Sequence, residues 1–416
     1  MEKFVLAERF NQLRPNVWAV FAKLAQDNQP LANLGSGYPD VMPPDFVKDS
    51  LLRSAMDPGL HQETDSLGHP RLVKALLTLY STLLRREMKP EEFLIVAGAY
   101  EGLFATFYSL LDPGDEAILI EPYFDCYEAM CTTAGAVPIF VTMRPNSSGN
   151  WTIDMSELRS AFTSRTKMVV LNTPHNPVGK VFSRQELTAI ASLCCEHDVV
   201  VVMDEVYEWS VFDGEHVRMA SLPGMWERTI TIGSAGKSFG VTGWRIGWVY
   251  GPADLMGYLQ RVHLVLANSC WTPIQEAVAL AIERELSMFG RPDSYWSQLP
   301  QILKSKCDRL CSILEKAGFR VFRPQAGFFV VVDFSEHPQK SMLDAMESIS
   351  SDSSTEEKEA ADVRFARWLC EEKKVLAIPP SCFYSLRNAG EAKNLLRFCF
   401  FKESKTLDHA EKNLLS

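Results

Sequence analysis

The chain contains a series of short runs dense in Val, Ile and Leu. They recur between residues 93 and 251 and are separated by stretches with helical spacing. A strand that is apolar along its whole length must be buried on both faces, which is typical of a parallel sheet covered by helices. The pattern therefore predicts an α/β fold with strands at residues 93–98, 116–122, 168–174, 199–205, 229–234 and 246–251.

The patterning also divides the chain into parts. Residues 4–26 place apolar side chains at helical spacing, which predicts a short N-terminal arm that needs something to pack on. After residue 290, Leu/Ile helical spacing over 302–316 precedes three further apolar runs, which predicts a smaller α/β domain. We expect an arm and small-domain contribution at 1–30, a large domain at 31–290 and a small domain at 291–416, with 335–362 as a solvated insertion.

Composition excludes several classes of protein. The 416 residues suit about two domains, and the net charge of -10 disfavours nucleic acid as a partner. No apolar run approaches the length of a membrane span, and Glu2 and Glu8 argue against a transit peptide, so we expect a cytoplasmic protein without membrane contact. The ten cysteines include no CxxC pair. Reduced core thiols are therefore favoured over a metal site, although Cys194–Cys195 and Cys307/Cys311 leave metal binding or redox sensing open.

Chemically informative residues follow the predicted strands, where ligands bind in open parallel sheets. Each has an ordinary alternative: Asn176 could belong to an Asn-Pro turn, Tyr207 could be a core tyrosine, and Lys237 could be a surface lysine. Asp204 ends a run of four valines and a methionine, and a carboxylate there needs a cation or donors. The combination, more than any single member, indicates a site.

This set meets the requirements of a phosphorylated pyridine aldehyde. Such a cofactor needs an amine (Lys237), a carboxylate for the ring nitrogen (Asp204), and donors for the ring oxygen. Its phosphate needs helix-start amides, a hydroxyl and a cation. The candidates for the phosphate site are Ala99, Tyr100, Ser234 and Arg245.

Motifs along nearly the whole chain, from about residue 14 to residue 405, support the same cofactor. NLGSGYPD, GAYEGLF, EPYFDCYE, NTPHNPVGKVF, DEVYEW, GSAGKSFGVTGWRIGW, AIPPSCFYS and LRFCFFK occur in this order. Together they resemble class I aminotransferases of fold type I, within the group of kynurenine aminotransferase, glutamine transaminase K and cysteine-S-conjugate β-lyase. The resemblance implies a mostly parallel, seven-stranded type of sheet in a large domain that binds pyridoxal 5'-phosphate, with a smaller α/β C-terminal domain.

The resemblance implies roles around the cofactor. Lys237 would be the Schiff-base lysine and proton carrier, Asp204 would pair with the pyridine nitrogen, and Phe124 would stack on the ring. Asn176 and Tyr207 would bind the ring oxygen, and the phosphate would be held by the residues named above: Ala99, Tyr100, Ser234 and Arg245. The catalytic set would be Lys237, Asp204 and Tyr207, with ping-pong transfer between an amino acid and a 2-oxo acid.

The resemblance also implies a substrate site. Arg397 would grip the α-carboxylate, helped by Asn176 and the Gly35 amide. Trp18, with Tyr100, Phe124 and Trp271, would line an aromatic pocket. That pocket favours aromatic or large unbranched substrates such as kynurenine, phenylalanine, glutamine or methionine.

In the group that the chain resembles, two subunits share each active site, so a homodimer is expected. Glu63 stands where relatives usually carry a tyrosine near the phosphate, and Cys270 and Trp271 stand where an aromatic residue and a histidine are usual. Glu63→Tyr is expected to tighten cofactor binding, unless the loop is displaced and Glu63 faces solvent. Two alternatives to transamination stay open: β-elimination from cysteine S-conjugates, and a regulatory relative without turnover.

Overall fold

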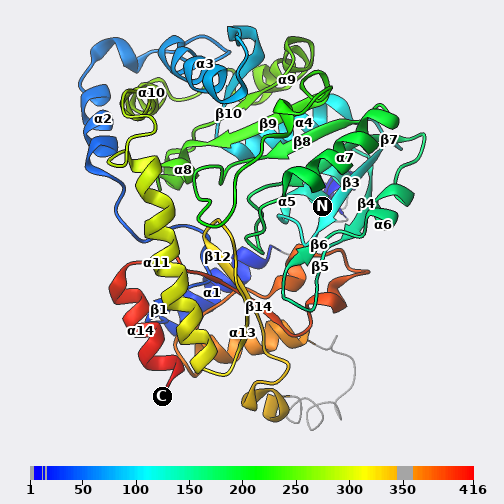
Figure 1. Ribbon diagram of the computed structural model, residues 1–416, viewed down its shortest axis with the longest axis vertical. Helices are drawn as coiled ribbons and strands as arrows, with labels where there is room; N and C mark the ends of the chain where they lie inside the picture. Colours follow the sequence, from blue (N-terminus) through cyan, green and yellow to red (C-terminus); the bar gives the residue numbers. More distant parts are fainter. Residues whose placement is uncertain (1–3, 12, 15, 344–358) are drawn as a thin grey trace.

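A seven-stranded sheet forms the centre of the larger part of the molecule (Figure 1). The computed structural model describes residues 4–11, 13–14, 16–343 and 359–416. In spatial order the strands are β2 (Phe93–Val96), β10 (Gly247–Tyr250), β9 (Thr229–Ser234), β8 (Val200–Asp204), β7 (Thr166–Asn172), β3 (Glu116–Glu121) and β4 (Val137–Thr142). All are parallel except β10, which runs antiparallel to both neighbours.

The predicted α/β class is therefore confirmed, and all six predicted runs form strands. Strands β2, β3, β9 and β10 are buried at every residue, as strands covered on both faces must be. The seventh strand, β4, was not predicted. It lies at the sheet edge, where Val137 is exposed and Pro138, Ile139 and Phe140 are only partly buried, so it lacks the continuous apolar run of a central strand.

Helices cover both faces of this sheet. One apolar core joins the sheet to α4 (Ala99–Leu110), α5 (Cys126–Thr133) and α9 (Ala253–Leu266), and another joins it to α6 (Met155–Ser160) and α7 (Arg184–Glu196). A third contains α3 (Pro70–Leu84) and α10 (Thr272–Ser287), which also packs on α2 (Asp45–Ala55). Because α4 begins directly after β2, its N-terminus faces the same edge as the ends of β8 and β9.

A smaller antiparallel sheet lies below the large one in Figure 1 and contains β11 (Arg320–Phe322), β12 (Phe329–Asp333) and β14 (Leu395–Cys399). The three apolar runs predicted after residue 316 form these strands. Helices α11 (Tyr295–Lys316), α13 (Ala361–Glu371) and α14 (Ser404–Leu414) share its core. Within the predicted insertion at 335–362, residues 344–358 lie outside the described part of the chain.

The N-terminal segment packs against this C-terminal part. Helix α1 (Val17–Asn28) buries Phe21 in the core of the smaller sheet, and β1 (Ala32–Asn33) pairs with β13 (Val375–Leu376). Asn16 caps α1, because its side chain accepts a hydrogen bond from the Ala19 amide at 3.2 Å. The N-terminal arm therefore packs on the C-terminal part of the chain. The exact domain boundaries stay a prediction.

The remaining elements are short. A two-stranded hairpin, β5 (Arg144–Pro145) and β6 (Trp151–Thr152), extends from the large sheet toward the small one, and α8 (Ala235–Ser238) follows β9. The short 3-10 helices are η1 (Glu8–Phe10), η2 (Pro58–His61), η3 (Pro90–Glu92), η4 (Met219–Ser221), η5 (Trp226–Arg228), η6 (Thr242–Trp244), η7 (Pro380–Phe383) and η8 (Ala389–Ala392).

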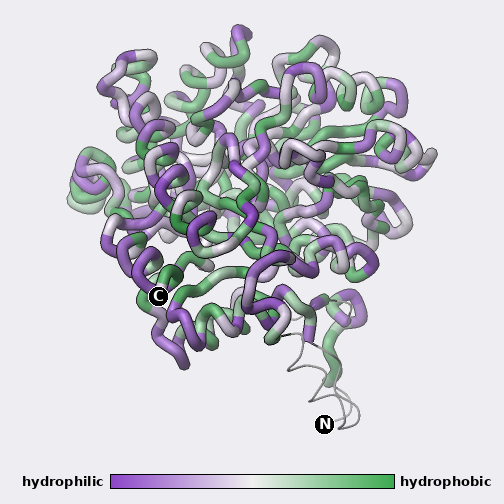
Figure 2. The backbone as a smooth tube through the Cα atoms, turned by 60° about the horizontal axis from the view of Figure 1, so that its bottom comes forward, coloured by the Kyte–Doolittle hydropathy of each residue, from purple (hydrophilic) through white to green (hydrophobic). Residues whose placement is uncertain are grey.

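The distribution of hydropathy fits this layered arrangement. Outer helices alternate polar and apolar segments in Figure 2, as expected where one face packs inward and the other meets water. Among the described helices, none combines the length and the apolar character that crossing a membrane requires.

Candidate active site

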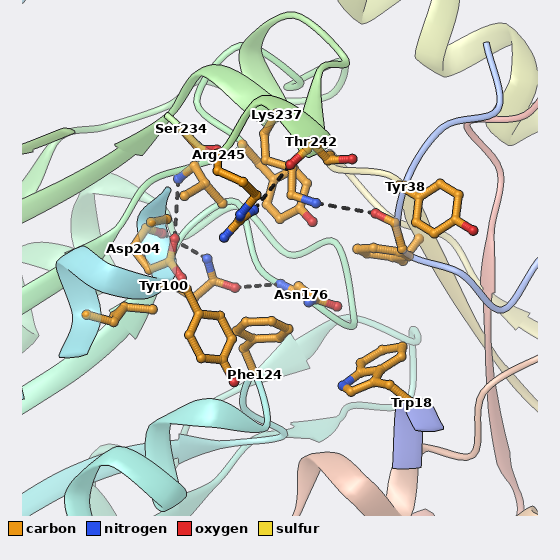
Figure 3. Close-up of a pocket in the computed structure, with 18 of the residues that line it drawn as sticks. Trp18, Tyr38, Tyr100, Phe124, Asn176, Asp204, Ser234, Lys237, Thr242 and Arg245 are labelled. Atoms are coloured by element: carbon orange, nitrogen blue, oxygen red, sulfur yellow. Dashed lines mark hydrogen bonds between the residues drawn. The ribbon is translucent and has the colours of Figure 1, made fainter. Parts of the chain in front are cut away.

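One cavity of about 390 Å³ lies where β7, β8 and β9 end, facing β14 of the smaller sheet. Ligands in open α/β sheets bind at this position, beyond the carboxyl ends of the parallel strands. The labelled side chains in Figure 3 surround it. Its lining includes all the predicted cofactor residues, namely Ala99, Tyr100, Phe124, Asn176, Asp204, Tyr207, Ser234, Lys237 and Arg245.

Lys237 projects into the cavity from α8, directly after β9. Its Nζ lies 3.3 Å from the Gly37 carbonyl oxygen, to which it donates a hydrogen bond, and 5.6 Å from the centre of the Tyr207 ring. Burial lowers the pKa of this amine to about 8, with Arg397 and Arg245 adding repulsion. A larger fraction of this side chain than of an ordinary lysine is therefore uncharged near neutral pH, which favours a nucleophilic or basic amine.

Asp204 ends β8 and is buried in the same cavity. Its Oδ2 accepts a hydrogen bond from the Tyr127 hydroxyl at 2.5 Å, and its Oδ1 accepts one from the Val206 amide at 3.4 Å. Burial nevertheless raises its pKa to about 6. No Lys or Arg of the described residues forms an ion pair with it, so this carboxylate would be stabilised by a cationic group placed in the cavity.

A cradle for an anionic group lies at the start of α4. Neither the Ala99 nor the Tyr100 amide donates a hydrogen bond to a described residue, which is the usual state of a helix N-terminus and suits phosphate. Gly98 precedes them with φ of 81°, and a Cβ there would lie 2.7 Å from the Arg245 guanidinium. Ser234 completes this side of the cavity.

Two residues that position Asp204 and Asn176 were not predicted from the sequence. Asn172 ends β7 and orders the site, because its side chain donates to the Asp204 carbonyl at 2.8 Å and accepts from the Asn176 amide at 2.7 Å. Tyr127 holds Asp204 as described above. The signal for Asn172 was its position at the end of an apolar strand, the same signal that identified Asp204.

Arg397 lies in β14 and is 1% exposed. Its terminal nitrogens donate to the Asn176 Oδ1 at 3.1 Å and to the Gly35 carbonyl at 3.0 Å, and burial lowers its pKa. No carboxylate of the described residues forms an ion pair with it, and Phe329 and Phe383 rings lie 4.1 and 5.0 Å from its guanidinium. A buried cation in these surroundings calls for an anionic ligand.

An aromatic wall adjoins Arg397. The Trp18 ring lies 5.1 Å from the guanidinium, and its Nε1 donates to the Asp125 Oδ2 at 2.7 Å. Tyr100 and Phe124 pack edge to face at 6.1 Å between ring centres and both line the cavity. The predicted aromatic pocket is therefore formed by three of its four members.

Three residues that the sequence analysis placed in or near the site do not line the cavity. Trp271 is 52% exposed and immediately precedes α10, outside the cavity lining of its own chain. Gly35 reaches the site through its carbonyl, which accepts from Arg397, rather than through its amide. Glu63 is exposed and also lies outside the cavity lining.

A buried ion network lies directly behind Asp204. Glu205 and His216 are 2.9 Å apart, and Glu208 accepts from the Tyr80 hydroxyl at 2.6 Å and from Arg218. The carboxylate and imidazole atoms of Glu205, Glu208 and His216 lie within 4.8 Å of one another, as metal ligands can. Both oxygens of Glu208 already have protein donors, however, so this network is structural. The ten cysteines are free thiols, and the Cys307 and Cys311 sulfurs lie 3.8 Å apart in the core.

Comparison with known proteins supports the chemistry that the cavity suggests. The family model for aminotransferase class I and II matches residues 29–414. The chain belongs to this family. The similarity of the aminotransferase fold is equally extensive: Bna3p from Saccharomyces cerevisiae superposes with a TM-score of 0.89 at 34% identity, covering 99% of this chain and 98% of that one.

Two curated relatives are more similar to this aminotransferase in sequence. It is 44% identical to kynurenine--oxoglutarate transaminase 3 of Mus musculus, over 99% of this chain and 90% of that protein. It is 43% identical to kynurenine--oxoglutarate transaminase 1 of Homo sapiens, over 100% of this chain and 98% of that protein. A methionine aminotransferase from Escherichia coli, YbdL, has a TM-score of 0.85 at 27% identity, over 99% of both chains.

Proposed function

We propose that this aminotransferase uses pyridoxal 5'-phosphate to transfer an amino group from an aromatic or large unbranched amino acid to a 2-oxo acid. Kynurenine, phenylalanine, glutamine and methionine are the favoured donors. The observation that carries this proposal is Arg397, a buried cation beside three aromatic rings and in one cavity with Lys237. An α-carboxylate fits the cation, and a large side chain fits the aromatic wall.

The residues present fit the cofactor. The uncommitted Ala99 and Tyr100 amides, Ser234 and Arg245 would hold its phosphate, and the absence of a side chain at Gly98 leaves room for the Arg245 guanidinium beside these amides. Asp204, buried and without a cationic partner, would keep the ring nitrogen protonated. The bound cofactor supplies an electron-accepting ring that stabilises negative charge at the substrate Cα.

The protein's own groups would then do the following. Arg397 and Asn176 orient the substrate by its carboxylate, so that the Cα proton faces Lys237. Lys237, whose amine has a pKa near 8, would remove the proton from the substrate Cα and hold it for return as the transfer is completed. Trp18 and Phe124 cover the substrate side chain and exclude water from the cavity.

Homodimerisation and a cytoplasmic location belong to the same proposal. Apolar side chains exposed on the single chain support the dimer, among them Phe4, Val5, Leu264, Val265 and Trp271. Phe4 and Val5 belong to the N-terminal arm, Leu264 and Val265 to the end of α9, and Trp271 lies immediately before α10. A mass measurement at micromolar concentration tests the dimer, and cell fractionation tests the location.

The decisive experiment offers the purified protein a panel of amino acids with several 2-oxo acids. We expect the aromatic and large unbranched donors to give the highest kcat/KM, and borohydride reduction to fix the cofactor's mass on Lys237. The matched variant Lys237→Arg keeps the charge and should retain folding but lose turnover. Release of pyruvate and ammonia from a cysteine S-conjugate would indicate β-elimination instead, and inactivity across the panel would indicate a regulatory relative.

A further inference from the structure

A second cavity, of about 690 Å³, lies between the large sheet and the smaller one. The β5–β6 hairpin and Met143, which follows β4, form one wall, and strands β11, β12 and β14 with residues 384–395 form the other. Figure 1 shows this hairpin beside the orange-red segment that leads into β14. The cavity shares no lining residue with the candidate active site.

The lining of this second cavity is rich in positive charge. Four of its side chains are cationic: Arg144, Arg320, Arg387 and Lys393. Only two are carboxylates, and one of them, Glu391, is paired with Arg144 at 3.1 Å. Within the described part of the chain, the other three cations form no ion pair. In a chain of net charge -10, this local excess of positive charge would attract anions.

A buried hydrogen-bond donor lies among the same residues. The Nε1 of Trp151 has no acceptor among the described residues, although the side chain is 5% exposed. A buried donor left without an acceptor costs about 1–3 kcal/mol. The indole packs edge to face on Phe322 at 5.7 Å, and the Arg320 guanidinium lies 5.4 Å from the Phe322 ring. The cavity thus combines an aromatic floor, a spare donor and unpaired cations.

The position of this cavity connects it to the substrate grip. Tyr384, in its wall, directly follows Phe383, whose ring lies 5.0 Å from the Arg397 guanidinium. Leu395, also in the wall, precedes Arg397 by two residues in β14. A ligand here would contact both segments that hold Arg397, and it would bridge the two sheets.

We propose that this second cavity binds a small multivalent organic anion, a phosphate ester or a polycarboxylate, and that the bound anion changes the affinity of the enzyme for its amino acid substrate. The charge of the anion is matched by Arg320, Arg387 and Lys393. The bound anion is coupled to Arg397 through η7 and β14, the two segments that hold this side chain. Its effect therefore appears in the KM for the amino acid substrate. Binding itself does not depend on which amino acid the enzyme uses.

Calorimetric titration of the cofactor-loaded enzyme at constant ionic strength tests the proposal. The probes are inorganic pyrophosphate, citrate and ADP, which separate phosphate from carboxylate recognition and test whether a ring adds affinity. We expect one site per chain for at least one probe. In the double variant Arg387→Gln/Lys393→Gln, the affinity should fall at least tenfold. In the control Lys167→Gln/Arg184→Gln, which removes the same charge from exposed positions outside the cavity, it should be unchanged.

Kinetics give a second readout. The bound anion should shift the amino acid KM of the wild type and of the control, and leave that of Arg387→Gln/Lys393→Gln unshifted. Should the double variant bind poorly because residues 384–395 are distorted, the variant Arg320→Gln tests the same loss of affinity from β11, outside that segment. Absence of binding by all three probes would overturn the proposal, as would equal weakening in both double variants, which would indicate general charge attraction.

Discussion

Replacing Asp204 by Asn should stabilise the cofactor-free protein while impairing its function. Burial raises the pKa of Asp204 from 3.8 to about 6, which is a difference of about two pKa units. Each unit corresponds to about 1.4 kcal/mol, so holding the carboxylate ionised at pH 7 costs the folded protein about 3 kcal/mol. Loss of one hydrogen bond subtracts about 1 kcal/mol. The expected net gain is about 2 kcal/mol.

The pH dependence follows from the direction of this shift. Because the pKa of Asp204 is higher in the folded protein, the folded state binds more protons than the unfolded state between pH 3.8 and about 6. The cost is fully present above about pH 6 and is gone below 3.8. The gain from Asp204→Asn should therefore be largest at pH 7 and about a third as large at pH 5, where the ionisation cost falls to about 1.6 kcal/mol and the lost hydrogen bond still subtracts about 1 kcal/mol.

Urea unfolding of the cofactor-free protein at both pH values measures this gain. Asp213→Asn, at an exposed position, is the matched control and should change the free energy of unfolding by less than about 0.5 kcal/mol. Added cofactor should reverse the order of stability, because only the wild type offers a carboxylate to the ring nitrogen. An Asp204→Asn protein that is less stable than the wild type at pH 7 would refute the reasoning.

Three further predictions concern single side chains. Arg397→Lys should raise the amino acid KM about 100-fold through loss of a bidentate grip, while turnover of an amine without a carboxylate should stay unchanged. Cofactor uptake by the cofactor-free protein should speed up as pH rises through about 8, where Lys237 loses its proton, and absorbance measures this rate. Arg218→Leu should cost about 3–5 kcal/mol in urea unfolding, because Glu208 becomes a buried unpaired charge, and adding Glu208→Gln should restore part of it.

The fold could be predicted from the sequence wherever burial was complete. The six apolar runs between 93 and 251 form strands. They could be recognised because a strand that is buried on both faces is apolar along its whole length. Strand β4 escaped prediction because Val137 and its neighbours lie at an edge, where the apolar pattern is interrupted by Pro138. Its place in the sheet is set by pairing with β3 over six residues, a contact that no local pattern encodes.

Some residues of the candidate site could likewise be predicted from the sequence, and others could not. Asp204 and Lys237 were predictable, because strand ends of a parallel sheet meet at one edge. The environment of Arg397 was not, since its neighbours Trp18, Phe329 and Phe383 come from distant parts of the chain. Trp271 lies outside the cavity of its own chain, and its place in the pocket stays a prediction, because its position depends on where α10 begins, which spacing alone does not determine.

The position of Glu63 provides a test of whether a second copy of the chain contributes to the active site. The preceding Gln62 carbonyl accepts a hydrogen bond from the Thr272 hydroxyl at 2.7 Å, which fastens this loop to the start of α10 and leaves Glu63 exposed outside the cavity. Within one chain, its charge cannot act on the cofactor at contact range. An effect of Glu63→Tyr on cofactor affinity would therefore have to come from a second copy of the chain. It should disappear when the protein is diluted to monomers, whereas an effect that persists in the monomer would mean that the loop moves into its own cavity.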